Sequence, residues 1–138
     1  MNMDDIDLKL LELLKDDGRA SYIDLGKKLS LSEAAVRRRV RKMVDDGTIK
    51  RFTLEIKERE RAMALTLLST APNTPTYDVA GRITKINGVE KVYEITGQYD
   101  IAVLMSGPNI AEVNKVIDEI RKADGVINTN TVIILREL

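Results

Sequence analysis

The sequence predicts an α+β protein in which a short helical domain precedes a second domain of alternating strands and helices. Three observations support this fold class. Apolar residues recur at helical spacing in the first third, strand-like and helix-like stretches alternate from residue 62 onward, and basic side chains concentrate within residues 27–51. That block holds nine basic and three acidic side chains, whereas residues 52–138 hold ten basic and twelve acidic ones. We therefore expect two domains with different tasks, at residues 1–53 and 62–138, joined by a linker at 54–61.

The composition excludes several classes of protein. A hydrophobic content of 43% over 138 residues is enough for a packed core and rules out disorder of the whole chain. Because Cys and His are absent, thiol and imidazole catalysis, disulfides and Cys/His zinc sites are excluded, and we predict no metal site. The apolar stretches are too short to span a bilayer, and the start MNMDDIDLK is acidic where a signal peptide is basic. We expect a cytoplasmic protein without a membrane partner.

Three short helices fit within the first domain. The first covers residues 4–14, where acidic residues favour the helix start and leucines follow at helical spacing. The second covers residues 21–29, because the hydroxyl of Ser21 followed three residues later by the carboxylate of Asp24 is a helix-capping arrangement. The third covers residues 32–46 and begins at a serine that favours the N-cap position.

The third helix has one apolar and one basic side. Its buried stripe comprises Val36, Val40, Met43 and Val44. The opposite side carries Ala34, Arg38, Arg41 and Lys42, flanked by Arg37 and Arg39. An isolated charge run is more often a solvated surface. Here two capped helices joined by a short turn, with small residues and guanidinium groups on the second, predict a helix-turn-helix that enters the DNA major groove.

The segment after the third helix is predicted to be extended. Residues 48–54 alternate β-branched and aromatic residues, so they form either a short wing or a linking strand. Lys50 and Arg51 either contact phosphate or solvate the linker, and the charged run at residues 57–61 is interpreted as a hinge.

The second domain is predicted to follow the order βαββαβ. Strands are expected at residues 62–70, 89–96, 100–106 and 126–135. Helices are expected at residues 76–86 and after the Gly107–Asn109 turn, and Gly97 supplies the backbone freedom for a tight reversal between the central strands.

An internal repeat supports this order. Residues 83–89 (ITKINGV) match residues 120–126 (IRKADGV) at an offset of 37, and each copy spans a helix end, a turn and a strand start. Duplicated βαβ halves build a ferredoxin-like sheet with both helices on one face. The last strand is nevertheless apolar on both sides, where a sheet covered on one face should alternate with polar residues. The second apolar face predicts a dimer through this domain, unless the linker covers it.

These motifs together resemble the Lrp/AsnC, or feast/famine, family of transcriptional regulators nearly from end to end. The most specific segments are DDIDLKLLELLKDDGRASYIDLGKKLSLSEAAVRRRVRKMVDDGTIKRF and VYEITGQYDIAVLM, with the family's Gly-x-Tyr-Asp turn at residues 97–100. The resemblance implies an N-terminal helix-turn-helix and a C-terminal ferredoxin-like domain that dimerises and assembles further into a tetramer or octamer. It also implies double-stranded DNA as a partner and a small amino acid as effector, with no other cofactor.

The resemblance also implies site residues. The DNA face maps to Ser32, Ala34, Arg37, Arg38, Arg41 and Lys42, and the effector site maps to Gly97, Tyr99, Asp100, Thr129 and Thr131. Asp100 would pair with the ammonium of an amino acid while the Gly97 backbone and the threonine hydroxyls hold its carboxylate. The alternative role of Asp100 is to cap its own turn. Tyr77 either adds a ring to this pocket or packs against the fold.

Three other functions compete with that of an amino-acid-responsive regulator. An enzyme on a ferredoxin-like scaffold is disfavoured, because the remaining carboxylates show no paired or metal-ligand spacing. An RNA-binding protein is disfavoured, because one Phe and four Tyr make no stacking platform on the sheet. An effector-independent architectural DNA-binding protein remains as the alternative, and it differs from a sensor only if no small molecule changes its affinity for DNA.

Overall fold

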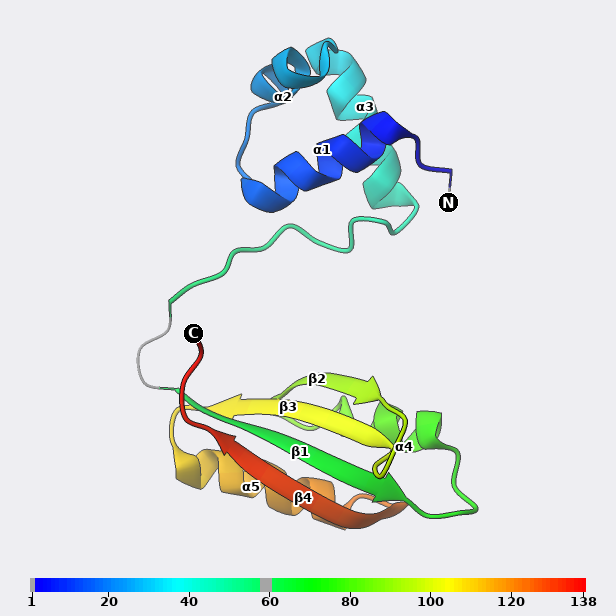
Figure 1. Cartoon of the computed structure of the whole chain (residues 1–138), viewed down its shortest axis with the longest axis vertical. Helices are drawn as coiled ribbons and strands as arrows, with labels where there is room; N and C mark the ends of the chain where they lie inside the picture. Colours follow the sequence, from blue (N-terminus) through cyan, green and yellow to red (C-terminus); the bar gives the residue numbers. More distant parts are fainter. Residues whose placement is uncertain (1, 58–60) are drawn as a thin grey trace. The chain divides into compact units, whose positions relative to one another are not determined.

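The computed structural model describes residues 2–57 and 61–138, and the chain divides into two compact units, Met1–Lys57 and Glu58–Leu138. The first unit is helical and the second combines a sheet with two helices (Figure 1). The α+β prediction is therefore confirmed. Part of the predicted linker, residues 58–60, lies outside the described residues.

Three helices build the first unit: α1 at Asp5–Asp16, α2 at Tyr22–Leu29 and α3 at Glu33–Asp45. Each begins at a cap residue whose side chain accepts a hydrogen bond from the backbone N–H three residues further on; the caps are Asp4, Ser21 and Ser32. The serine caps confirm both predicted starts. The helices enclose an apolar core whose fully buried members are Leu10, Leu25, Val36, Val40 and Met43.

The predicted wing does not form a strand. Residues 50–57 have no regular secondary structure, and three apolar side chains of this segment, Phe52, Leu54 and Ile56, are 57%, 73% and 63% exposed. The alternation of these residues suits a strand, but a strand needs a neighbour with which to pair its backbone groups. Among the described residues of the chain, no such neighbour lies beside this segment.

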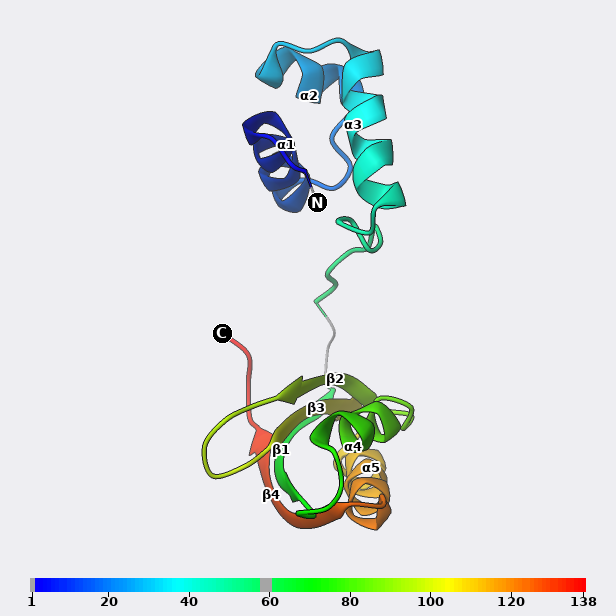
Figure 2. The ribbon, with the colours of Figure 1, turned by 90° about the vertical axis from the view of Figure 1, so that its right-hand side faces the viewer.

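The second unit follows the predicted order βαββαβ. Its strands are β1 at Ala62–Thr70, β2 at Val89–Glu94, β3 at Ile101–Gly107 and β4 at Val126–Ile134, and its helices are α4 at Thr76–Ile83 and α5 at Ile110–Lys122. The strands pair antiparallel in the order β2-β3-β1-β4. Figure 2 shows α4 and α5 on one face of this sheet, as the ferredoxin-like prediction requires.

Two predicted elements end earlier than expected. α4 stops at Ile83 rather than residue 86, and Thr84 Oγ1 then donates to the Gly81 carbonyl within the closing turn. β2 stops at Glu94 rather than residue 96, because the N–H of Ile95 donates to the carbonyl of Asp100 and closes the connection to β3. Neither difference changes the topology.

The internal repeat appears in the structure as a reciprocal pair of contacts. Gly88 and Gly125, which are 37 residues apart, both adopt a positive φ, +97° and +91°. A Cβ on Gly88 would lie 2.6 Å from Val116 of α5, and a Cβ on Gly125 would lie 2.7 Å from Val79 of α4. The two valines are again 37 residues apart. Each half of the unit therefore packs its glycine turn against the helix of the other half.

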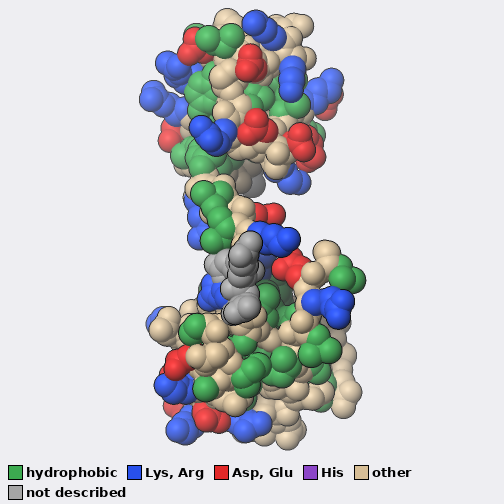
Figure 3. Space-filling view, turned by 90° about the vertical axis from the view of Figure 1, so that its left-hand side faces the viewer, with side chains coloured by type: hydrophobic (Ala, Val, Ile, Leu, Met, Phe, Trp, Pro, Cys, Tyr) green, Lys and Arg blue, Asp and Glu red, His purple; other side chains and the backbone are tan. Residues whose placement is uncertain are grey.

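One face of the sheet is covered and the other is not. Residues directly opposite in neighbouring strands point to the same face, so the register separates the two sets. Ala64, Leu68, Val103 and Met105 lie under the helices and are fully buried. The uncovered sheet face carries a set of apolar residues, Met63, Leu65, Leu67, Tyr93, Ala102, Leu104, Val132 and Ile134, and among them the polar residues Lys91, Ser106 and Asn130. Figure 3 shows hydrophobic side chains gathered on the surface of this unit.

Candidate functional site

The outward face of α3 carries the predicted DNA-contacting residues. A shallow hollow on this face is lined by Glu33, Ala34, Arg37, Arg38 and Arg41. The hydroxyl of Ser32 accepts a hydrogen bond from the N–H of Ala35 at 3.1 Å and so fixes the start of the helix. Of the six predicted DNA-contacting residues, the structure places Ala34, Arg37, Arg38 and Arg41 together around the hollow.

The three consecutive arginines have different surroundings. Arg37 donates to Glu33 Oε1 at 2.6 Å, and its guanidinium carbon lies 5.7 Å from the centre of the Tyr22 ring. Arg39 points the other way and bonds carboxylates of α1. In the part of the chain that the structure describes, no hydrogen bond or ion pair engages the guanidinium groups of Arg38 and Arg41. These two cations are therefore available to an external anion.

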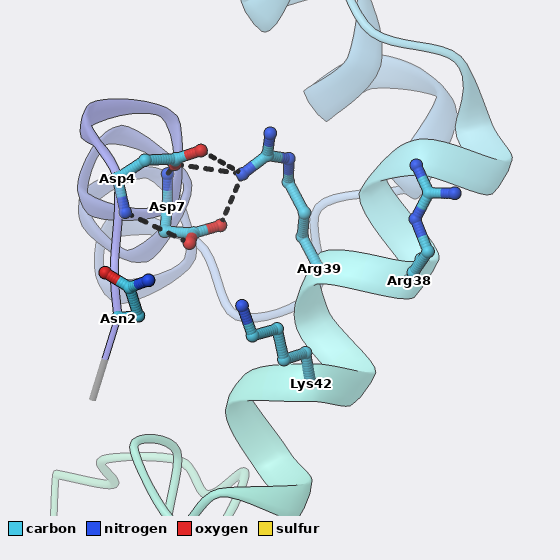
Figure 4. Close-up of a pocket in the computed structure, with 6 residues that line it drawn as sticks. All are labelled: Asn2, Asp4, Asp7, Arg38, Arg39 and Lys42. Carbon is cyan, nitrogen blue, oxygen red and sulfur yellow. Dashed lines mark hydrogen bonds and ion pairs between the residues drawn. The ribbon is translucent and has the colours of Figure 1, made fainter.

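Arg39 ties α3 to the start of α1. Its Nη1 donates to both oxygens of Asp4, at 2.9 and 2.7 Å, and to Asp7 Oδ1 at 2.9 Å. Asp4 and Asp7 also form a capping box, in which each side chain accepts from the backbone N–H of the other. Figure 4 shows Arg39 directed at this pair and Arg38 directed away from it.

The same cluster determines the electrostatics at the start of α1. The N–H of Asp7 and then the guanidinium of Arg39 hold the pKa of Asp4 below its ordinary value. The Asp7 side chain is only 6% exposed, so its negative charge depends on the arginine for compensation. Lys42 lines the adjoining pocket with Arg38 and Asn2, but no interaction is drawn from it in Figure 4.

Four residues of this region are absent from the predicted DNA face: Asp4, Asp7, Tyr22 and Glu33. Glu33 could have been indicated by its spacing of four residues from Arg37, which is the ordinary spacing of an ion pair on a helix. The Asp4–Asp7 spacing of three residues matches the capping-box pattern at a helix start. The contact of Tyr22 with Arg37 crosses from one helix to another, and no local pattern in the sequence indicates it.

The predicted effector residues lie at one end of the sheet. Gly97 is exposed with φ +114° in the connection between β2 and β3, and Tyr99 is half-buried in the same turn. The N–H of Asp100 donates to the Leu68 carbonyl at 2.8 Å. Thr129 is the residue of β4 opposite Leu68. Asp100 and Thr129 thus flank the same residue of β1 from its two sides.

Three of these side chains already have partners within the chain. Asp100 Oδ2 accepts from the N–H of Thr70 at 2.9 Å, so Asp100 caps the end of β1 rather than its own turn. The hydroxyl of Thr131 shares a 2.8 Å hydrogen bond with the fully buried Thr66, farther along the strand. The hydroxyl of Thr129 accepts from Arg121 Nε at 3.4 Å. Tyr77 is 80% exposed on α4, so it does not pack against the fold.

Other kinds of site are not seen among the described residues. In residues 2–57 and 61–138, no three or more Asp and Glu side chains gather in a way that could hold a metal ion. Over the same residues, no helix has the length and apolar character needed to cross a membrane.

Both units match known domain families. Residues 3–44 match the AsnC-type helix-turn-helix domain, and residues 63–138 match the Lrp/AsnC ligand binding domain. The chain belongs to the Lrp/AsnC family. It is accordingly a helix-turn-helix transcriptional regulator with a ligand-binding domain, and not an enzyme. The predicted family, fold and general function are therefore confirmed.

Individual proteins also match this chain over nearly their whole length. The transcriptional regulator LysM of Saccharolobus solfataricus is 47% identical over 135 residues, which cover 98% of this chain and 95% of LysM. The structure of LrpC of B. subtilis superposes with a TM-score of 0.79 and 26% identity, covering 100% of this chain and 98% of LrpC. A regulator of Neisseria meningitidis, NMB0573, solved as a complex with L-Met, gives a TM-score of 0.83 at 20% identity, covering 99% and 92% of the two chains.

Proposed function

We propose that this regulator reads operator DNA with the outward face of α3. The observation that carries the proposal is that, among residues 2–57 and 61–138, no side chain pairs with the guanidinium groups of Arg38 and Arg41, which lie beside the small side chain of Ala34. Arginine donates to guanine O6 and N7 in the major groove, and a small neighbour lets the helix approach the bases. The contact residues we propose are Ser32, Ala34, Arg37, Arg38, Arg41 and Lys42.

Two copies are proposed to act together through the uncovered sheet face. Val132 and Tyr93 of this face are 50% and 49% exposed, and its apolar members come from all four strands. Burial of such an apolar surface against a second copy removes it from water and lowers the free energy. A two-fold dimer carries two helix-turn-helix units, so the operator should be roughly palindromic, with half-sites one or more turns of about 34 Å apart. Further assembly of dimers into a tetramer or octamer belongs to the same proposal.

The DNA proposal is tested by footprinting and by single alanine variants. Arg38→Ala or Arg41→Ala should weaken binding to the preferred operator by about 1–3 kcal/mol if a base contact is lost. Lys9→Ala is the matched control, because Lys9 lies on α1 beside a groove that α1 forms with α2 and its loss removes the same charge. Equal effects of all three variants would show that only the total charge of the unit matters.

The ligand is proposed to be a small amino acid bound at the turn before β3. One end of the sheet carries the carboxylate of Asp100, the backbone of the turn at Gly97 and Tyr99, and the hydroxyl of Thr129. A carboxylate suits the ammonium of an amino acid, and backbone N–H and hydroxyl groups suit its carboxylate. Thr131 would join them only by giving up its bond to Thr66. The complex of NMB0573 with L-Met, a protein of the same fold, supports this class of ligand.

Light scattering and DNA titration with each of the twenty amino acids test the effector. We expect one of them to change the assembly state or the affinity for DNA. Asp100→Asn should abolish that response, because the amide keeps an oxygen for the N–H of Thr70 but loses the charge that pairs with an ammonium. If no amino acid has any effect, the effector-independent architectural protein becomes the better description.

A further inference from the structure

One acidic side chain lies on the face of α3 proposed to read DNA. Glu33 is the first residue of the helix and lines the same hollow as Ala34, Arg37, Arg38 and Arg41. Its side chain is 47% exposed. A carboxylate at this position repels the phosphates of DNA and lowers the affinity for any sequence. Its presence among the cations therefore needs a reason other than affinity.

Glu33 and Arg37 form a preorganised unit. Glu33 Oε1 accepts from Arg37 Nη2 at 2.6 Å, and the ring of Tyr22 lies under the guanidinium at 5.7 Å. Arg37 is thus held on two sides. In the part of the chain that the structure describes, no donor bonds the second carboxylate oxygen of Glu33. The unit presents a free acceptor beside guanidinium N–H groups.

Helix stabilisation alone does not account for this placement. An acidic residue in the first turn favours a helix, and a pair spaced by four residues adds to this. Ser32 already caps α3, however, and the neighbouring positions Ala34 and Ala35 of the same turn would serve the helix dipole equally well. At position 33 the carboxylate bonds Arg37, and both residues line the DNA-facing hollow.

We propose that Glu33 determines specificity, and that Glu33 and Arg37 together read one C·G base pair. In the major groove, cytosine presents its N4 amino group as a donor, and the paired guanine presents O6 and N7 as acceptors. The carboxylate accepts from the cytosine while the guanidinium donates to the guanine. The first residues of a recognition helix are those that contact base edges. The inference rests on the proposed role of α3 in DNA binding.

Selection of preferred sites from a library of random duplexes, using the full chain, tests this proposal. The variants are Glu33→Gln, Arg37→Lys and the matched control Glu12→Gln, which removes one acidic charge from the exposed pair with Lys15 on α1. Arg38→Ala reports separately on the proposed function. Melting curves confirm that each variant remains folded, which we expect because all of the altered side chains are largely solvent-exposed.

Glu33→Gln should weaken the preference for C·G at one base pair of each half-site by roughly 5- to 100-fold, because the amide loses the charge and replaces one acceptor oxygen by a donor. Arg37→Lys should lose the preference at that same base pair, because lysine cannot present two donors to guanine. Glu12→Gln should leave every preference unchanged. The inference would be overturned if Glu33→Gln selected the same consensus as wild type, or if it gained the same affinity for specific and for random DNA. Weaker binding by Arg38→Ala would still support the proposed function in that case. If the wild-type chain selects no sequence at all, both fail.

Discussion

Replacing Arg39 by alanine should destabilise the first unit without altering the surface proposed to read DNA. The substitution removes three hydrogen bonds of 2.7–2.9 Å to Asp4 and Asp7. Loss of one member of a fully buried ion pair costs about 3–5 kcal/mol, whereas an exposed pair contributes about 0–1 kcal/mol. Because Asp7 is 6% exposed and Arg39 26% exposed, we expect unfolding of the unit to become easier by about 2–3 kcal/mol.

Hydrogen exchange of the backbone amides in α1 and α3 measures this effect within the first unit of the intact chain. The expected loss corresponds to exchange that is roughly 30- to 150-fold faster. Arg38→Ala is the matched control, since it removes the neighbouring guanidinium and should leave exchange unchanged while weakening DNA binding. Unchanged protection in Arg39→Ala, or faster exchange in Arg38→Ala, would refute the assignment of Arg39 to stability and of Arg38 to DNA binding.

Three further predictions concern the two units separately. Gly88→Ala should lower the stability of the second unit by about 2–4 kcal/mol, because Gly88 has a positive φ and α5 approaches it closely. Gly81→Ala on the helix α4 should instead raise stability by about 0.5–1 kcal/mol, because its new Cβ meets open space. Thermal melts measure both effects, and a Gly88→Ala variant as stable as Gly81→Ala would contradict the packing. The lowered pKa of Asp4 means that its charged form stabilises the fold, so this stabilisation is present above the ordinary aspartate pKa and is lost as the pH falls through the lowered one. The melting temperature of wild type should therefore exceed that of Asp4→Asn at neutral pH. The difference should begin to shrink near the ordinary aspartate pKa and be lost as the pH falls through the lowered pKa of Asp4, and a difference that does not shrink over this range would argue against the ion pair with Arg39. Leu65→Lys should convert the proposed dimer to a monomer in light scattering without unfolding the sheet, and an intact dimer would place the interface elsewhere.

Features determined by local chemistry could be predicted from the sequence. The serine caps at Ser21 and Ser32 and the repeat of the Gly88 turn at Gly125 each depend on residues close together in the chain. The predicted strand after residue 47 failed because strand formation depends on a paired neighbour, which the pattern of apolar residues does not reveal. Ends of elements failed for a related reason, as at Glu94, where a backbone bond across the connection decides the boundary.

The contacts of the candidate DNA face also depend on packing that the local sequence does not determine. Helical periodicity correctly placed Val36, Val40 and Met43 on the buried side of α3, but it also placed there Val44, which is 43% exposed in the last turn of the helix. It could not tell that Arg39 is engaged by Asp4, 35 residues away in the chain, while Arg38 is not. That distinction depends on how α1 packs against α3. The partners of Asp100 and Thr131 were likewise beyond prediction, because both lie on other strands or strand ends.

The reciprocal packing of Gly88 on Val116 and of Gly125 on Val79 has a consequence for how the second unit folds. Each half packs its glycine turn on the helix of the other half, and the central strand β1 pairs with β3 on one side and β4 on the other. A chain in which one half alone has formed leaves its glycine turn without the surface against which it packs. The two halves should therefore form and unfold in a single cooperative step, although they repeat one another in sequence.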